Sequence, residues 1–248
     1  MSTRLNILAG RTALVTGASR GIGAAVAVLL AEQGADVAIN FRSKGARAER
    51  VAAEVQAFGR HALMAQADLT DAADVAAMIG AIEQEFKHLD VLVLNASGGL
   101  EKGKPASYAM ELNLTAQVRM LKAALPLMRR GGCVVFVTSH LAHFYGSKPV
   151  YAAYEGIAAS KKAGEEALRS RLPLLDSRDI RSAIVSGDMI DGTITPKLLE
   201  REQRGLIETR RGQAGALPTV QEFAAAIVDA AADAQRPTGH ATFVGPTD

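Results

Sequence analysis

A tyrosine and a lysine seven positions apart form the part of this sequence best suited to chemistry. They are Tyr154 and Lys161, in the stretch Y-E-G-I-A-A-S-K. Seven residues of α-helix turn through roughly 700° and rise about 10.5 Å, so the two side chains share one helix face. A phenol there can donate a hydrogen bond to an oxygen that gains negative charge, and the ammonium raises the local positive potential. Such a pair can stabilise negative charge on an oxygen atom of a bound molecule.

Three glycines near the start of the chain predict a site for a dinucleotide. The segment T-A-L-V-T-G-A-S-R-G-I-G at 12–23 predicts a strand, a tight turn and the start of a helix, with Gly17, Gly21 and Gly23 in the turn. Glycine permits close approaches that a Cβ atom would block. The free N–H groups of the first helical turn can then hold a pyrophosphate. A tight turn that binds nothing is the alternative, and the position between strand and helix favours the dinucleotide.

The composition limits the classes of function. The 248 residues are 48% hydrophobic, and 28 basic against 26 acidic residues give a net charge of +2. Because the basic residues are scattered, we expect no nucleic-acid partner. The longest apolar run, near 24–31, is far shorter than the ~20 residues of a membrane span, and residues 1–10 do not resemble a signal peptide. We expect a cytoplasmic protein with no membrane partner, and no metal, since no His/Cys/Asp cluster has ligand spacing.

Alternating strand-like and helix-like stretches must position the candidate residues. We expect seven strands, at 12–16, 36–40, 61–66, 91–94, 133–138, 180–185 and 242–244, and six helices near 21–33, 44–58, 71–86, 107–129, 151–171 and 219–235. Strands buried on both faces with helices between them indicate a parallel sheet covered on both sides. Right-handed crossovers then give a doubly wound (Rossmann) α/β fold. We expect one domain over residues 1–248, with Cys133 buried in a strand.

A glycine-rich segment after the sixth strand, residues 188–215, is expected to be a substrate lid. It combines glycines, charges and few large apolar side chains around one short helix, L-L-E-R-E-Q-R. Few buried contacts would hold such a segment, so we expect weak order without ligand and closure when substrate and cofactor are bound. A surface excursion without function is the alternative.

The turn T-G-A-S-R-G-I-G resembles the nucleotide fingerprint of the short-chain dehydrogenases/reductases, and the resemblance covers nearly the whole chain. It implies an adenine-facing aspartate in A-D-L at 67–69, a cofactor loop from 95, a water-holding asparagine in E-L-N-L-T, an active-site serine in V-T-S and a nicotinamide contact in V-S-G-D-M-I-D. Two positions in or beside these segments depart from the family pattern. Leu94 replaces the first asparagine of N-N-A-G, and Ser186 replaces the proline of the P-G loop.

The residues after the second strand favour NADP(H) over NAD(H). An NAD site needs a carboxylate there, which accepts a hydrogen bond from the ribose 2′-hydroxyl. The strand ends instead in N-F-R-S-K, and Arg20 stands in the glycine turn beside it. The guanidinium of Arg42 can hold a 2′-phosphate through two hydrogen bonds. A solvated basic start of a helix is the alternative.

These arguments together give a set of expected site residues. Those expected to bind the cofactor are Gly17, Ser19, Arg20, Gly21, Ile22, Gly23, Asn40, Arg42, Ser43, Asp68, Leu69, Asn95, Ala96, Ser97, Lys161, Gly187 and Ile190. Those expected to take part in catalysis are Tyr154, Lys161, Ser139, Asn113 and Tyr145.

The family's Y-x-x-x-K motif is absent, because Ile157 stands four residues before Lys161. The Tyr154–Lys161 spacing is similar to that of bacterial enoyl-thioester reductases, divergent members of the same superfamily. Their chemistry implies that Tyr154 stabilises an enolate while hydride attacks the β-carbon of a conjugated C=C bond. Ile157 is then a wall of the pocket. Tyr151 is the alternative acid, although the residue four positions after it is Glu155 rather than lysine.

Other aromatic side chains follow Ser139 in the sequence. Tyr145 lies where enoyl reductases often carry a second tyrosine, whereas His140 and His143 are expected to be loop residues without a catalytic role. Three functions stay open. They are an NADPH-dependent reductase of an α,β-unsaturated carbonyl or acyl thioester, a ketoreductase of the same fold, and a degenerate NADP-binding sensor. Small residues on helices 107–129 and 151–171 allow close helix packing, and the family resemblance implies that these helices pair across a two-fold axis in a homodimer or homotetramer.

Overall fold

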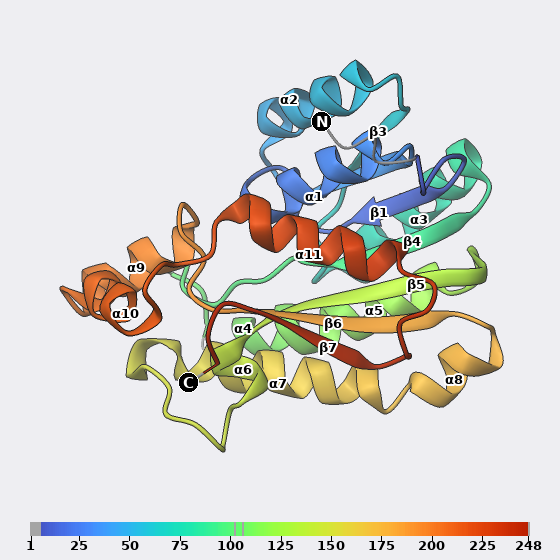
Figure 1. Ribbon diagram of the computed structural model, residues 1–248. Coiled ribbons are helices and arrows are strands. Elements are labelled where there is room, and N and C mark those ends of the chain that lie inside the picture. The colour runs from blue at the N-terminus through green and yellow to red at the C-terminus, as the bar shows by residue number, and fades with distance from the viewer. Residues whose placement is uncertain (1–5, 102, 106, 248) are drawn as a thin grey trace.

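The computed structural model describes residues 6–101, 103–105 and 107–247. Within them, seven strands form one parallel sheet in the order β3-β2-β1-β4-β5-β6-β7 (Figure 1). The strands are β1 (Thr12–Val15), β2 (Asp36–Phe41), β3 (Ala62–Gln66), β4 (Leu89–Leu94), β5 (Met128–Ser139), β6 (Arg181–Gly187) and β7 (His240–Val244). The predicted doubly wound α/β fold is therefore confirmed. The strand order reverses between β1 and β4, which is where such sheets form a crevice beyond the carboxyl ends of their strands.

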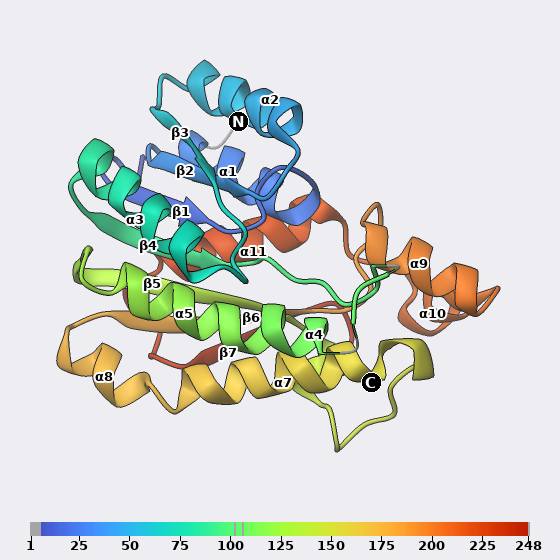
Figure 2. The same cartoon turned by 180° about the vertical axis from the view of Figure 1, so that it is seen from behind.

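Helices cover both faces of the sheet. The α-helices are α1 (Gly21–Glu32), α2 (Gly45–Ala57), α3 (Ala72–Phe86), α4 (Tyr108–Met110), α5 (Ala116–Ala124), α6 (His140–His143), α7 (Glu155–Arg169), α8 (Leu172–Ser177), α9 (Ile194–Glu202), α10 (Leu206–Ala214) and α11 (Val220–Ala232). Figure 1 shows α1 and α11 in front of the sheet, and Figure 2 shows α3, α5 and α7 on the opposite face. None of the described helices is long and apolar enough to cross a membrane.

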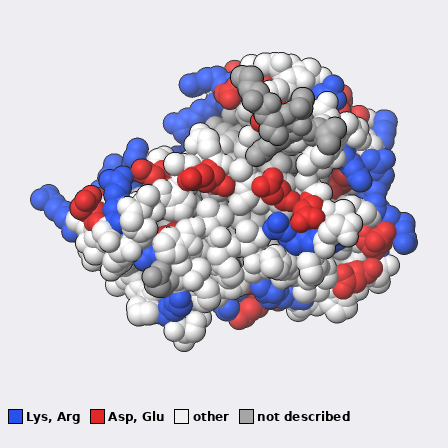
Figure 3. Space-filling model, viewed as in Figure 1, with Lys and Arg blue, Asp and Glu red and all other residues white. Residues whose placement is uncertain are grey.

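The two sides of the sheet hold separate apolar cores, because successive strand residues point to opposite faces. In β1, Val15 packs with α1 and α11, and its neighbour Leu14 packs with α3 and α5. Cys133 in β5 is 1% exposed, as predicted, and burial raises the pKa of its thiol to about 11. Figure 3 shows acidic and basic side chains interspersed over one face of the molecule.

The helix expected over 107–129 is interrupted and ends early. A π-helical turn, η1 (Glu111–Thr115), separates α4 from α5. Residues 125–129 were expected to be helical, but α5 ends at Ala124 and β5 begins at Met128. The reason is a sheet contact, since the backbone N–H of Leu89 donates to the carbonyl of Leu127 at 2.9 Å.

The helix expected over 151–171 is also divided. It begins with a 3₁₀ turn, η2 (Ala152–Tyr154), and continues as α7. The lid segment holds two helices, α9 and α10, in place of the one short helix that its sequence predicted. In Figure 1 these two helices project from one end of the sheet.

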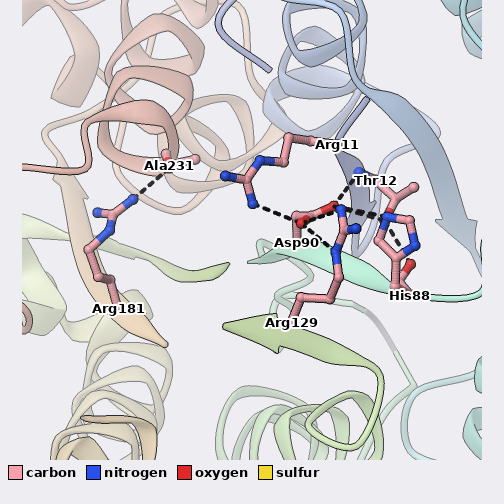
Figure 4. A network of polar contacts seen from close by, with 7 residues as sticks. All are labelled: Arg11, Thr12, His88, Asp90, Arg129, Arg181 and Ala231. Atoms are coloured by element: carbon pink, nitrogen blue, oxygen red, sulfur yellow. Dashed lines mark hydrogen bonds and ion pairs between the residues drawn. The ribbon is translucent and has the colours of Figure 1, made fainter. Parts of the chain in front are cut away.

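A buried aspartate ties the amino-terminal ends of β1, β4 and β5 together. Asp90 is 1% exposed, and its carboxylate accepts hydrogen bonds from Nη1 of Arg11 (2.9 Å), Nη2 of Arg129 (2.9 Å) and the backbone N–H of Thr12 (2.8 Å) (Figure 4). Burial raises the pKa of this carboxyl, but the hydrogen bonds outweigh burial and the pKa lies below its ordinary value of 3.8.

We expect Asp90→Asn to lower the free energy of unfolding by about 2 kcal/mol near neutral pH, because two guanidinium groups lose their anion. Since the folded-state pKa is lowered, this stabilisation is present above the ordinary pKa and is lost as pH falls through the folded value. In urea unfolding, the gap between variant and wild type should therefore shrink as pH falls below the ordinary value of 3.8. Asp179→Asn is the matched control, because its pair with Arg130 is long, 3.7 Å, and exposed. Equal losses in the two variants would contradict this role of Asp90.

Candidate active site

A large cavity opens at the carboxyl ends of the central strands. Its volume is about 1140 Å³, and it lies beside the glycine turn, the ends of β4, β5 and β6, and the start of α7. The expected site residues that line it are Arg20, Ile22, Asn95, Ser97, Ser139, Tyr154, Lys161, Gly187 and Ile190. The fold thus brings both ends of the predicted site, the glycine turn and the tyrosine–lysine pair, to one cavity.

Two hydroxyl groups converge in this cavity. The phenol oxygen of Tyr154 lies 3.3 Å from Oγ of Ser139, the last residue of β5. Oγ of Ser139 also accepts a hydrogen bond from the backbone N–H of Ala142, which caps α6 and fixes the serine. Tyr154 is 5% exposed, and burial raises the pKa of its phenol despite the hydrogen bond with Ser139. A single carbonyl oxygen placed between the two hydroxyls can accept from both.

Lys161, on α7, lines the same cavity. Its side chain is 9% exposed, and burial lowers the pKa of the amine to about 8. Ile157, which stands between Tyr154 and Lys161 in the sequence, is 6% exposed and forms an apolar part of the cavity wall. The lysine is therefore a cation that the fold holds with little water around it.

The other two candidate tyrosines are placed differently. Tyr151 lines the large cavity and is half-buried, and burial raises the pKa of its phenol. The hydrogen bond to Ser139 comes from Tyr154, however. Tyr145 lines a separate, smaller cavity of about 540 Å³. Tyr145 is not among the residues that line the large cavity, although the two cavities share Lys148, Pro149 and Val150, so its catalytic role stays a prediction.

Asn113 lies inside the π-helical turn, and its side chain forms hydrogen bonds with other protein groups. Its side-chain amide donates to the carbonyl of Gly98 and to Oγ of Ser160, each at 2.9 Å, and its Oδ1 accepts from the backbone N–H of Gly98 at 3.3 Å. The side chain therefore clamps the loop after β4 to α7. A Cβ atom on Gly164 would come within 2.2 Å of the main-chain oxygen of Asn113, so this glycine allows α7 to approach closely.

The glycine turn has the form of an anion cradle. Gly17 and Gly21 have φ angles of +65° and +56°, which side chains disfavour. A Cβ atom on Gly23 would lie 2.5 Å from the carbonyl oxygen of Gly17 and 2.6 Å from Nδ2 of Asn95. The N-terminus of α1 has no side-chain cap and no acid in its first turn, so its N–H groups suit a pyrophosphate.

Comparison with known proteins agrees with this geometry. The family model of the short chain dehydrogenases matches residues 11–203. The chain belongs to the short-chain dehydrogenase family. The family resemblance predicted from the glycine turn is therefore confirmed.

The match spans about three-fifths of the length of the curated relatives. A hydroxynaphthalene reductase of Aspergillus fumigatus is 37% identical over 161 residues, which are 62% of this chain and 58% of that protein. Versicolorin reductase 1 of Aspergillus parasiticus is 36% identical over 155 residues, 60% of this chain and 59% of that protein.

Solved structures match nearly the whole chain. A short-chain dehydrogenase from Burkholderia cenocepacia in complex with NADP has a TM-score of 0.83 and 29% identity, covering 96% of this chain and 97% of that one. The angucycline C-6 ketoreductase LanV with bound NADP has a TM-score of 0.78 and 28% identity, covering 97% and 96%.

Two residues expected to touch the cofactor are buried structural residues of this short-chain dehydrogenase. Asn40 is 2% exposed, and its amide joins Gly17 N–H (3.1 Å) to the carbonyls of Ala65 (3.1 Å) and Ala67 (3.3 Å). It holds the glycine turn against the end of β3, and both polar atoms of its side chain have protein partners. Leu69 is 4% exposed in the core beneath α3, and only its backbone can face the crevice.

Five other expected residues are not among those that line the cavity, namely Ser19, Arg42, Ser43, Asp68 and Ala96. Arg42 is exposed after β2, and its Nη1 donates to the hydroxyl of Tyr108 at 2.6 Å. Oδ1 of Asp68 accepts from the backbone N–H and hydroxyl of Thr70, at 3.0 and 2.7 Å. Ser43 is exposed beside Arg42, Ser19 is half-buried in the glycine turn, and Ala96 offers its carbonyl to Gln117.

The lid segment is held more firmly than its sequence predicted. Arg210 of α10 and Asp188 form an ion pair of 2.9 Å whose side chains are 12% and 9% exposed. Arg210 also donates to the carbonyl of Pro246, a wall of the cavity near the end of the chain. Leu199 and Leu206 are each 3% exposed. The ion pair joins positions 22 residues apart, which no local signal in the sequence indicates. Most other residues of 188–215 are exposed or half-buried, so weak order without ligand stays a prediction.

Both histidines after Ser139 take structural contacts. His140 is 7% exposed and lies between Oγ of Ser186 (2.8 Å) and the carbonyl of Gly245 (3.3 Å), and burial lowers the pKa of its imidazole. His143 pairs with the buried Glu165 at 3.0 Å. Sequence reasoning gave both a loop role but missed that they anchor α6 to β6, α7 and the chain end.

Proposed function

We propose that this protein is an NADP(H)-dependent ketoreductase that acts on an apolar carbonyl compound. The observation that carries the proposal is the 3.3 Å contact between the Tyr154 phenol and Oγ of Ser139, both facing the cavity that Lys161 also lines. Two donors at one point suit the oxygen of the carbonyl that is being reduced.

Each side chain has a distinct part in that reaction. Ser139 and Tyr154 orient the carbonyl oxygen and stabilise the charge that develops on it. Tyr154 then transfers its phenolic proton to that oxygen, while the carbonyl carbon receives a hydride, and the product is an alcohol. The Lys161 ammonium favours the phenolate that remains, because opposite charges attract strongly in a buried site. When bound, NADPH supplies the hydride.

The glycine turn and its surroundings fit this cofactor. Gly17, Gly21 and Gly23 with the first turn of α1 would hold the pyrophosphate, and Arg20 and Arg42 the 2′-phosphate. Lys161 would bind the ribose hydroxyls. The NADP complexes of the similar Burkholderia and LanV structures support the same choice.

We expect Arg42→Ala to weaken NADPH binding about tenfold or more, because one charge-assisted contact typically contributes ~1.5–3 kcal/mol. NADH lacks the phosphate, so its affinity should stay within about twofold. Fluorescence titration of the reduced cofactors measures both. Equal affinity of the wild type for NADPH and NADH would contradict the assignment.

The cavity walls favour an apolar, ring-containing substrate. Among its lining residues are Leu100, Leu141, Phe144, Val150, Tyr151, Met189 and Leu198. The names of the hydroxynaphthalene, versicolorin and angucycline reductases all refer to compounds with fused rings. We therefore propose ketones on fused rings as the substrate class.

Reduction of a conjugated C=C bond is the second candidate, favoured by the seven-residue spacing of Tyr154 and Lys161. In it, the same phenol stabilises an enolate and the β-carbon receives the hydride. One substrate distinguishes the two reactions. With NADPH deuterated at C4 of the nicotinamide and a cyclic enone of one to three rings, ketoreduction places deuterium on the carbinol carbon of an allylic alcohol. Enoyl reduction places it on the β-carbon of a saturated ketone, and mass spectrometry with NMR locates it.

The assembly and location of the protein are also proposals. We propose a cytoplasmic homodimer or homotetramer with one domain per chain and a lid at 188–215. Of the small residues expected to allow helix pairing between protomers, Ala116, Ala124 and Ala158 are fully buried inside the protomer. Ala152 and Ala153 are exposed and are left for such a contact. Light scattering that gave a monomer at micromolar concentration would exclude it.

A further inference from the structure

The segment between β4 and α5 places a phenol and a cation next to Arg42. The hydroxyl of Tyr108 accepts the 2.6 Å hydrogen bond from Arg42, a residue 66 positions away that follows β2. The Lys104 ammonium lies over the Tyr108 ring, 4.6 Å from its centroid. Tyr108 is 8% exposed, so its ring has a fixed place in the core beside α3 and α5. Two cations from distant segments therefore meet at one phenol.

The nearby acids are engaged elsewhere. Asp68 turns Oδ1 to the backbone and hydroxyl of Thr70, and Glu101 accepts from the backbone N–H of Gly99 at 2.6 Å. Burial raises the pKa of Asp68, but the Thr70 hydrogen bonds and the charges of Arg42 and Lys104 lower it overall. Asp68 thus lies within the field of both cations without a hydrogen bond to either of them. Positive charge remains for an anionic ligand.

We propose that Lys104 and Tyr108 determine cofactor specificity, with the adenosine 2′-phosphate bound between Arg42 and Lys104 and with Tyr108 holding the guanidinium in position. This inference rests on the proposed function, because it takes Arg42 to face NADP(H). A phosphate monoester carries nearly two negative charges at neutral pH, so two cations match it better than one. A guanidinium already held by a phenol also loses less side-chain entropy when phosphate binds.

The same segment also forms part of the substrate cavity. Gly98, Leu100 and Glu101 line the cavity, and Asn113 clamps the backbone of Gly98. A phosphate that holds Lys104 therefore restrains the chain only three residues beyond the cavity wall. Binding of NADPH should slow backbone hydrogen exchange at 98–101 more than binding of NADH, when both cofactors are saturating.

The decisive experiment measures the dissociation constants of NADPH, NADH and 2′,5′-ADP for the wild type, Lys104→Ala, Tyr108→Phe and Arg42→Ala. We expect Lys104→Ala to weaken NADPH and 2′,5′-ADP about fivefold to tenfold, and NADH by less than about twofold. Tyr108→Phe keeps the ring and should weaken NADPH about threefold. Because Tyr108 acts through Arg42, adding Tyr108→Phe to Arg42→Ala should cause no further loss. Lys122→Ala, which removes an exposed lysine from α5, is the control for lost charge.

The outcomes separate the inference from its foundation. If Arg42→Ala weakens NADPH binding but Lys104→Ala and Tyr108→Phe bind NADPH like the wild type, Lys104 and Tyr108 do not take part in phosphate binding. The proposed cofactor then stands. If the wild type does not prefer NADPH over NADH, the proposed cofactor itself fails. Unchanged NADH binding in each variant shows that the fold is intact.

Discussion

Tyr154→Phe should lower kcat/KM by about 10²-fold or more while the affinity for NADPH stays within about twofold. The substitution removes only the hydroxyl and keeps the buried ring, which belongs to one apolar cluster with Ile157 and with Leu199 and Leu206 of the lid. Without the hydroxyl, the carbonyl oxygen loses its proton donor and one of the two hydrogen bonds that stabilise its charge. Steady-state kinetics with a ketone substrate and fluorescence titration of NADPH measure the two effects.

Tyr151→Phe is the matched control, since the second tyrosine lines the same cavity from the preceding turn. Its hydroxyl lacks the contact with Ser139, so we expect a change of less than about threefold in kcat/KM. The reverse pattern, with Tyr151→Phe inactive and Tyr154→Phe active, would transfer the acid role to Tyr151. It would also remove the significance of the seven-residue spacing.

The fold could be predicted from the sequence because its signals are local. Short β-branched runs alternate with helical periodicity, and glycines mark the first turn, so strand order follows from general rules of chirality. The break in the helix over 107–129 could not be predicted. It is stabilised by the Asn113 side chain, whose partners Gly98 and Ser160 lie 15 and 47 positions away. A π-helical turn of this kind has no period of its own in the sequence.

The site could be predicted where a residue's role depends on its element, and not where it depends on a distant neighbour. Ser139, at the end of β5, and Lys161, in α7, reached the expected cavity because strand ends and helix faces are set by topology. Asn40 also follows this topology, yet its amide is used by Ala65 and Ala67 of the next strand. Tyr145 depends on the path of a loop, which local residue preferences do not fix.

Lys161→Met should abolish most turnover and yet stabilise the protein without cofactor. The wild-type ammonium is buried, and burial alone lowers its pKa from 10.5 to about 8. This difference means that burying the charged amine lowers the free energy of unfolding by about 3 kcal/mol at neutral pH. Methionine fills a similar volume with no charge to desolvate. Turnover should fall by about 10²-fold or more, because the phenolate of Tyr154 loses its cation.

The stability difference between Lys161→Met and the wild type should change with pH, which a merely structural role of Lys161 would not produce. Between about pH 8 and pH 10.5 the unfolded state binds more protons than the folded state, so the wild type gains stability as pH rises through that window. Lys161→Met has no such group, and its advantage in urea unfolding should be largest below about pH 8 and shrink above it. Lys122→Met, at an exposed position on α5, should unfold like the wild type at every pH. If Lys161→Met is less stable than the wild type near pH 7, Lys161 is not a desolvated cation in the folded protein. That result would also contradict its proposed electrostatic stabilisation of the Tyr154 phenolate.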